Sequence, residues 1–290
     1  MDFNFIFSDI LPTSIIHGLL LSLVGLGIYI TYKLLNFIDL SAESIFILGA
    51  SIFGTMINND INYIISFLSA ILACSFIGLS VTYISLKYKI NSMLITIIIA
   101  MIIYSLNLKI LGVPNIPLNE IYFPFNNESL ILKGLFITSL ITLTFYTLIN
   151  FLKTEVGLRF RLVGLNPKMA RAYSINQLFY VTIGTIIANS LIAIAGIMHS
   201  QNVGYVDINM ANGLLIQGLA SVMIGEMIMV KYRKSLIFSP LIGAIIYSSI
   251  ENLIMLFDFI KPTDFRMVTG ILVLISIILN SKRKVKSLAS

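Results

Sequence analysis

Long apolar stretches, each about the length needed to cross a bilayer, follow one another along most of the sequence. A hydrocarbon core about 30 Å thick takes roughly 20 helical residues, because each residue adds about 1.5 Å. The pattern predicts nine spanning helices, or eight to ten if one span is broken or re-entrant: 14–32, 40–57, 63–86, 92–111, 130–152, 177–198, 208–230, 236–257 and 266–280. The connections are short, so residues 1–290 are expected to form a single all-α transmembrane domain.

The basic residues are concentrated in alternate connections between the predicted spans. Fifteen of the 19 follow the first, third, fifth, seventh and ninth spans, and five of these fifteen lie between 153 and 176. Cytoplasmic loops of membrane proteins carry the excess of Lys and Arg. The 153–176 connection is therefore expected in the cytoplasm and the N-terminus outside.

The composition agrees with a polytopic membrane protein. Hydrophobic residues make up 58% of the chain and charged residues 11%, whereas a soluble domain has about 25% charged residues. The net charge of +6 lies mainly on the predicted cytoplasmic loops, so it indicates topology rather than a nucleic-acid partner. A single cysteine, Cys74, excludes an internal disulfide.

Two segments resemble each other. Asp39 and Leu40 precede a Gly-Ala-Ser-Ile sequence at 49–52, and Asp207 and Ile208 precede Gly-Leu-Ala-Ser-Val at 218–222. Five predicted spans separate the two segments, so they would have opposite orientations in the membrane, as in the inverted repeats of transporters. Chance similarity between helices rich in small residues is the alternative.

The longest predicted cytoplasmic connection, 153–176, contains signals for a short helix. Asn166 is a suitable N-cap and Pro167 a suitable first residue, which predicts a helix over about 167–174. Met169, Ala172 and Tyr173 would share one face. So short a helix needs a surface to pack on. That surface is either the protein's own membrane domain or a groove on a cytoplasmic partner, and we favour the partner.

Acidic residues in or near the spans are candidates for a translocation path, because a charge in a span is costly. Asp39 and Glu43 lie where the first two spans meet, and they could instead cap helices. Glu251 lies deepest; a structural ion pair with Arg266 is the favoured interpretation and a path role the alternative. Three amides in or beside the seventh span are further path candidates, although such groups more often bond between helices: Asn209, Asn212 and Gln217.

Motifs for several enzymatic activities are absent from the sequence. There is no GxxxxGK[ST] phosphate loop, nucleophile elbow or HExxH, and no Cys/His cluster has zinc-ligand spacing. The chain is therefore expected to bind no cofactor and to catalyse no reaction of its own.

Four stretches, in order along the chain, resemble permease subunits of bacterial ABC importers of the branched-chain-amino-acid type, and most closely the tryptophan/tyrosine-type group. They are LNFIDLSAESIFILGAS (35–51), YSLNLKILGVPNIPL (104–118), GLRFRLVGLNPKMARAYSIN (157–176) and NVGYVDINMANGLLIQGLASVMIGE (202–226). The resemblance implies a fold similar to the vitamin-B12-type importers, with an inverted repeat, in the cytoplasmic membrane.

The resemblance also implies partners. These are a second copy or a sister permease, ABC ATPase subunits that carry ATP and Mg, an extracytoplasmic binding lipoprotein and membrane lipids. The segment Gly164–Ser174 resembles the coupling segment of the family. Its implied ATPase-facing residues are Asn166, Pro167, Met169, Ala170, Arg171 and Tyr173.

The chain departs from the family pattern at three positions. Ser44 and Ile47 replace the usual Gly and Pro, and Ser174 replaces the usual Gly at the end of the coupling segment. Ser is a poorer residue than Gly for a left-handed helix terminus.

These observations favour the permease subunit of an ATP-driven importer for a small metabolite. The expected substrate is an amino acid, and aromatic amino acids are among the candidates. Two alternatives stay open: a secondary carrier with inverted repeats, for which Glu251 is the one candidate coupling-ion site, and a membrane scaffold subunit that transports nothing.

Overall fold

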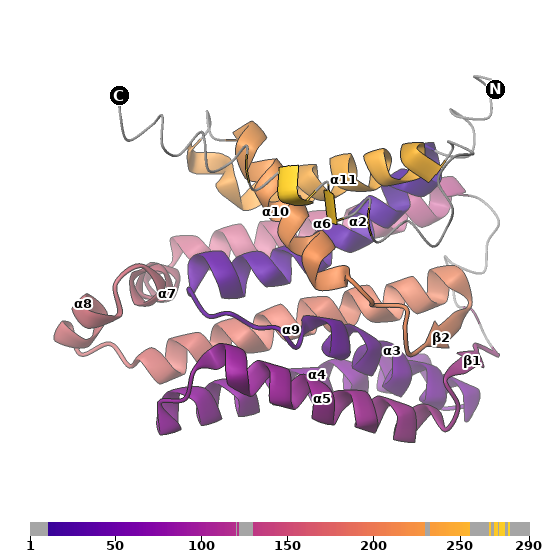
Figure 1. The fold of residues 1–290 in the computed structure, drawn as a ribbon, viewed down its shortest axis with the longest axis horizontal. Coiled ribbons are helices and arrows are strands. Elements are labelled where there is room, and N and C mark those ends of the chain that lie inside the picture. Colours follow the sequence, from indigo (N-terminus) through magenta and orange to yellow (C-terminus); the bar gives the residue numbers. More distant parts are fainter. Residues whose placement is uncertain are drawn as a thin grey trace. The chain divides into compact units, whose positions relative to one another are not determined.

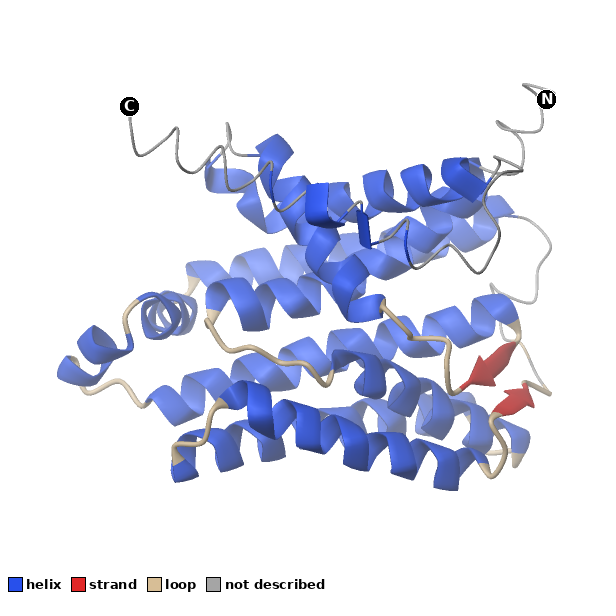
Figure 2. Ribbon diagram, in the orientation of Figure 1, coloured by secondary structure: helices blue, strands red, loops and turns tan. Residues whose placement is uncertain are grey.

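The computed structural model describes residues 11–119, 121, 130–229 and 233–255, with residues 267, 270–271, 273–275 and 278. Helices make up most of these residues, beside one pair of short strands (Figure 2). The elements are α2 (Leu11–Ile28), η2 (Tyr29–Leu34), α3 (Ala42–Asn58), α4 (Tyr63–Tyr88), α5 (Ser92–Leu111), β1 (Asn115–Pro117), α6 (Leu130–Lys153), α7 (Glu155–Leu165), α8 (Pro167–Ala172), α9 (Gln177–Val203), β2 (Tyr205–Asp207), α10 (Leu214–Met229), η3 (Arg233–Phe238) and α11 (Ser239–Met255).

Eight of the nine predicted spans coincide with these helices. Among the described residues, six segments are long and apolar enough to cross a membrane: Pro12–Leu34, Tyr63–Tyr88, Ser92–Leu111, Leu132–Lys153, Gln177–Val203 and Leu236–Ile254. The apolar helices α3 and α10 are shorter. The ninth predicted span, 266–280, lies almost wholly outside the described residues, so nine spans remains a prediction.

The chain divides into two compact units. One unit contains residues 27–126 and 146–212, and α3 and α4 both pack on its long helix α9. Glycines allow the backbones to approach closely. A Cβ at Gly196 would overlap the carbonyl oxygen of Phe46, and one at Gly49 would lie 2.9 Å from the Cα of Ala193. Small residues serve this purpose in membrane helices, where contact between helices depends on packing.

Hydrogen bonds between side chains reinforce the α4–α9 contact. The Oγ1 atoms of Thr82 and Thr185 are 2.7 Å apart, and the Oγ atoms of Ser75 and Ser190 are 2.8 Å apart. Because these pairs lie along two packed helices, they fix the register of α4 against α9.

A second set of bonds joins α3 to α5. Ser44 donates from Oγ to the carbonyl oxygen of Ala100 at 3.1 Å, and buried Asn107 donates from Nδ2 to the carbonyl oxygen of Ser44 at 3.1 Å. The departure from the family pattern at Ser44 therefore adds a contact between helices.

The same unit has different structures at the two ends of α9. Helices α7 and α8 lie at its N-terminal end, and the β1–β2 ladder lies at its C-terminal end (Figure 1). The strands pair antiparallel, with Ile116 opposite Val206. The connection that we predict to be cytoplasmic therefore lies at one end of α9, and the strand pair lies at the other end.

The other unit contains residues 1–26, 127–145 and 213–290, and its closest described contact is between α10 and α11. A Cβ at Gly243 would overlap the carbonyl oxygen of Ser221, and one at Gly225 would overlap that of Ser239. Gly18 brings α2 against α11, since a Cβ there would lie 2.8 Å from the Cα of Ile245. Both units therefore pack their helices through glycine.

The seventh predicted span begins later than expected. We predicted helix from residue 208, but α10 begins at Leu214. The Oδ1 atom of Asp207 accepts a hydrogen bond from the backbone N–H of Asn209 at 2.6 Å, and Gly213 has a φ of 84°. This local turn replaces the first helical turns.

Glycine at the α3–α9 contact is predicted to be essential for folding. In the variant Gly196→Val, the side chain would overlap the backbone of α3, so we expect loss of the monodisperse detergent-solubilised protein in fluorescence-detected size-exclusion chromatography. The matched control is Gly134→Val, because a Cβ at Gly134 would meet no atom within 4 Å. A monodisperse Gly196→Val protein with unchanged thermal stability would contradict the assigned packing.

Candidate functional site

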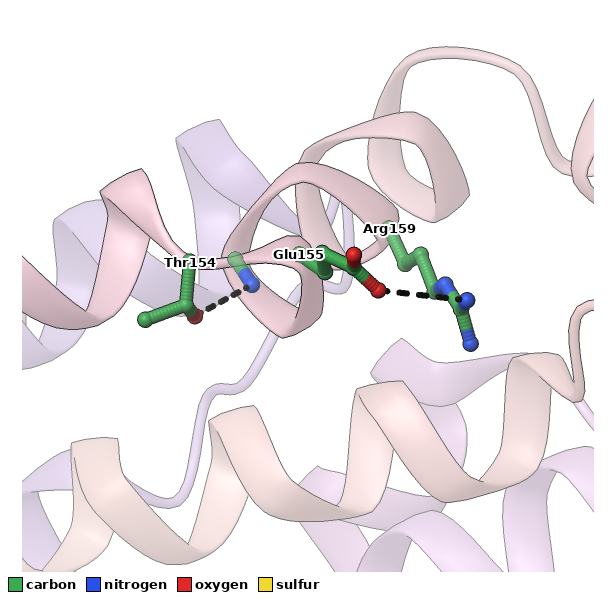
Figure 3. Close-up of polar contacts among 4 residues, drawn as sticks. Thr154, Glu155 and Arg159 are labelled. Carbon is green, nitrogen blue, oxygen red and sulfur yellow. Dashed lines mark hydrogen bonds and ion pairs between the residues drawn. The ribbon is translucent and has the colours of Figure 1, made fainter.

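Helix α7 turns sharply out of α6 at Thr154. The Oγ1 atom of Thr154 caps α7 by accepting a hydrogen bond from the N–H of Gly157 at 3.2 Å (Figure 3). Glu155 and Arg159 form an ion pair at 3.7 Å along the exposed side of α7 (Figure 3). An exposed pair of this kind contributes about 1 kcal/mol at most. Glycine is needed at 157 because a Cβ would lie 2.5 Å from the Cα of Leu152.

Asn166 joins α7 to α8. Its N–H donates to the carbonyl oxygen of Leu162 at 2.9 Å, and its Oδ1 accepts from the N–H of Met169 at 3.0 Å. Asn166 is therefore the N-cap predicted for the short helix, and Pro167 is its first residue. Helix α8 ends at Ala172, two residues before the predicted end, and Ser174 takes the left-handed conformation with a φ of 57°.

Most of the predicted partner-facing side chains are exposed. Met169 is 44% exposed and Tyr173 is 66% exposed, and Asn166 and Arg171 are exposed too. Pro167 is half-buried. The prediction for Ala170 requires a correction, because its side chain is fully buried and so cannot face a partner. Ala170 instead anchors α8 to the rest of the chain.

A groove of about 620 Å³ lies beside α8, between this helix, α7 and the start of α9. Its lining combines apolar and aromatic side chains with polar ones: Leu162, Met169, Tyr173, Ile175, Phe179 and Tyr180, beside Arg159, Ser174 and Asn176. Together, α8 and this groove form what we call the α8 surface.

Asp39 and Glu43 lie at the start of α3. Asp39 is buried, and its Oδ1 accepts hydrogen bonds from the N–H of Ser41 at 2.9 Å and from the Oγ of Ser41 at 2.6 Å. Burial raises the pKa of the Asp39 carboxyl, and the two bonds from Ser41 oppose this shift. Glu43 is half-buried in the first turn of α3. Asp39 thus shapes the turn into α3.

Glu251 and Gln217 lie together in the unit that contains α10 and α11. The Nε2 of Gln217 donates to the Oε1 of Glu251 at 3.2 Å. One residue further on, Asn252 donates from Nδ2 to the Oγ of Ser14 at 2.9 Å. The predicted ion partner of Glu251, Arg266, lies outside the described residues. The structure therefore brings together two of the predicted path residues.

Asn209 and Asn212 lie in the exposed turn before α10. The Nδ2 of Asn212 donates to the Oδ1 of Asn209 at 3.4 Å. These two residues belong to the unit of residues 27–126 and 146–212, whereas Gln217 and Glu251 belong to the other unit.

The sequence analysis missed helix α7. We treated 153–166 as connection, although Thr154 followed by Glu155 is an N-terminal helix signal. The importance of Gly164 within α7 was also missed, because its cause is a contact distant in sequence. Within the described part of the chain, no three His, Cys, Asp or Glu side chains are grouped to hold a metal ion.

Comparison with known proteins identifies the family to which this chain belongs. The family described as "Branched-chain amino acid transport system / permease component" matches residues 10–277. A tyrosine transport system permease protein of Clostridioides difficile (strain R20291) is 34% identical over 263 residues, covering 89% of this chain and 87% of the relative. An uncharacterized protein of Rickettsia prowazekii (strain Madrid E) is 28% identical over 276 residues, covering 93% of this chain and 97% of the relative. No solved structure matches the chain.

The family match extends across all the helices described above, including the α7–α8 segment and the α10–α11 pair. The chain therefore belongs to the permease components of the branched-chain amino acid transport family.

Proposed function

We propose that this chain is the membrane-spanning subunit of an ATP-driven importer in the cytoplasmic membrane. It would pair with a second copy or a sister permease, and an extracytoplasmic lipoprotein would deliver substrate to the pair. Two ABC ATPase subunits would bind ATP and Mg and dock at the cytoplasmic end. The chain itself would carry out no hydrolysis.

The α8 surface is the observation that carries this proposal. A six-residue helix is too short to be stable alone. Helix α8 packs beside α7 and the start of α9, yet Met169 on α8 and Tyr173 directly after it remain exposed. Lys168 and Arg171 are exposed on the same helix. Exposed apolar side chains edged with basic ones suit a protein partner that offers an apolar groove with acidic residues at its rim.

The substrate is proposed from the relatives. The Clostridioides difficile relative is named for tyrosine transport, and its similarity covers 89% of this chain. We therefore propose an amino acid substrate and use tyrosine as the first probe.

Local structure supports the proposed inverted repeat. Asp39 and Asp207 each accept a hydrogen bond through Oδ1 from the backbone N–H two residues further on, at 2.9 Å and 2.6 Å. Each turn precedes one of the two shorter apolar helices, α3 and α10. Paired short helices of this kind are typical of transporters built from repeats, and we propose a vitamin-B12-type arrangement with nine spans.

The double variant Met169→Asp/Arg171→Glu is expected to abolish tyrosine uptake while the protein still inserts in the membrane. The changes place two acids on the α8 surface, where the proposed partner is acidic. Uptake of radiolabelled tyrosine by whole cells and the amount of permease in membranes measure the two quantities.

The control is Met93→Asp/Lys87→Glu, which makes the same kinds of change at exposed positions in another basic connection. It should retain uptake within about twofold of the wild type. Undiminished uptake in the α8 double variant would contradict the coupling role.

For Glu251 we propose a contact with the moving substrate, through its position beside Gln217. Glu251→Gln is then expected to reduce tyrosine uptake at least tenfold, whether or not Arg266 is also changed to Gln. If the double variant Glu251→Gln/Arg266→Gln transports better than either single variant, the carboxylate serves a structural ion pair and the path role is wrong. Full uptake by Glu251→Gln alone would also contradict the path role.

A secondary carrier is the second candidate function, and it would explain an acidic residue within a span. Uptake that persists when cellular ATP is depleted but the proton and sodium gradients are kept would favour it over the importer.

A further inference from the structure

The first span ends in an unusual way. The π-helix η2 (Tyr29–Leu34) continues α2, and the N–H groups of Leu35 and Phe37 donate to the carbonyl oxygens of Ile30 at 3.1 Å and Thr31 at 2.9 Å. π-helical turns are rare and occur frequently at functional sites. Leu35 and Phe37 are 4% and 5% exposed, so packing holds this segment in place.

Helix α7 meets this segment backbone to backbone at Gly164. A Cβ at Gly164 would overlap the carbonyl oxygen of Leu34, and it would lie 2.7 Å from the carbonyl carbon of Leu34 and 2.9 Å from the Cα of Leu35. No flexible side chain lies in this contact that could move aside. A displacement of α7 toward η2 must therefore displace the backbone at 34–35.

Helix α9 supports the contact from a third side. A Cβ at Gly184 would overlap the side chain of Leu35 and lie 2.7 Å from the ring of Phe160. Phe160 on α7 is 1% exposed, and its ring meets that of Phe151 edge-on with centroids 5.9 Å apart. Because the surrounding side chains are closely packed, α7 cannot shift without moving its neighbours.

Helix α8 is firmly joined to this contact. Only Leu165 separates Gly164 from Asn166, and Asn166 bonds to both helices as described above. The side chain of Ala170 in α8 is fully buried. A force on the exposed side of α8 is therefore transmitted to Gly164.

The segment after Leu35 leads directly into α3. Its turn is closed by the bonds from Ser41 to Asp39, and α3 then packs on both α9 and α5. The physical path thus runs from α8 through Gly164 to residues 34–35 and on to α3, all within one unit.

We propose that the contact between Gly164 and the Leu34 backbone is the point where movement of α8 enters the membrane helices, with Gly164 as a positioning residue. This inference rests on the proposed function, since the movement would be driven by the ATPase bound at α8.

The test uses the full permease–ATPase complex in proteoliposomes, with radiolabelled tyrosine as the probe. The variant Gly164→Ala adds a Cβ at the contact and leaves the exposed side chains of α8 unchanged. We expect the ATPase to copurify within about twofold of the wild-type amount, while tyrosine transported per ATP hydrolysed falls at least tenfold. A purely structural role would lower the amount of complex rather than this ratio.

The matched control is Leu34→Ala, which keeps the carbonyl oxygen that faces Gly164 and should keep the ratio within about twofold. If Gly164→Ala does not accumulate, one glycine inserted between Leu165 and Asn166 interrupts the path without touching the contact. It should lower the same ratio. A wild-type ratio in Gly164→Ala, or in the insertion variant, would overturn the inference. If the proposed function is wrong, the purification step already reveals it, because no ATPase would copurify with the wild-type permease.

Discussion

Close approach of helix backbones at glycine is the constraint on which this structure depends. Lipid tails are as apolar as the side chains, so the hydrophobic effect does not drive helices together within a membrane. Helices in a membrane therefore gain stability by packing closely. At Gly196, Gly225 and Gly243 a single methyl group would overlap the carbonyl oxygen of a neighbouring helix. These contacts join α9 to α3 and α10 to α11, and each unit of the chain is built around one of them. Gly164 makes a contact of the same kind, between α7 and the backbone of Leu34. In our proposal this contact also transmits movement of α8 to the membrane helices.

Much of the fold could be predicted from the sequence, because hydrophobic length alone identifies spans. The observed helices match eight of the nine predicted ranges, and α5 matches at both ends. Some boundaries were wrong: α9 continues five residues past the predicted end, to Val203, and one start was delayed by a polar side chain that bonds to the nearby backbone. Asp207 illustrates this, since its turn delays the start of α10 from the predicted residue 208 to Leu214.

The candidate site was predicted only in part. Asn166 and Pro167 identified α8, because capping is a local property that neighbouring residues determine. The burial of Ala170 and the role of Gly164 depend on contacts with residues far away in the sequence, and no local pattern indicates them. Gln217 and Glu251 were both identified as polar groups in apolar surroundings, but their pairing across 34 positions appeared only in the structure.

The central claim is that an ATPase binds this permease at α8, and copurification tests it most directly. The tagged chain would be extracted from native membranes in a mild detergent and its companions identified by mass spectrometry. The account predicts a P-loop ATPase that accompanies the wild type and is lost when the exposed residues of 166–173 are mutated. A transport-competent permease recovered with no ATPase would contradict the account and favour a secondary carrier.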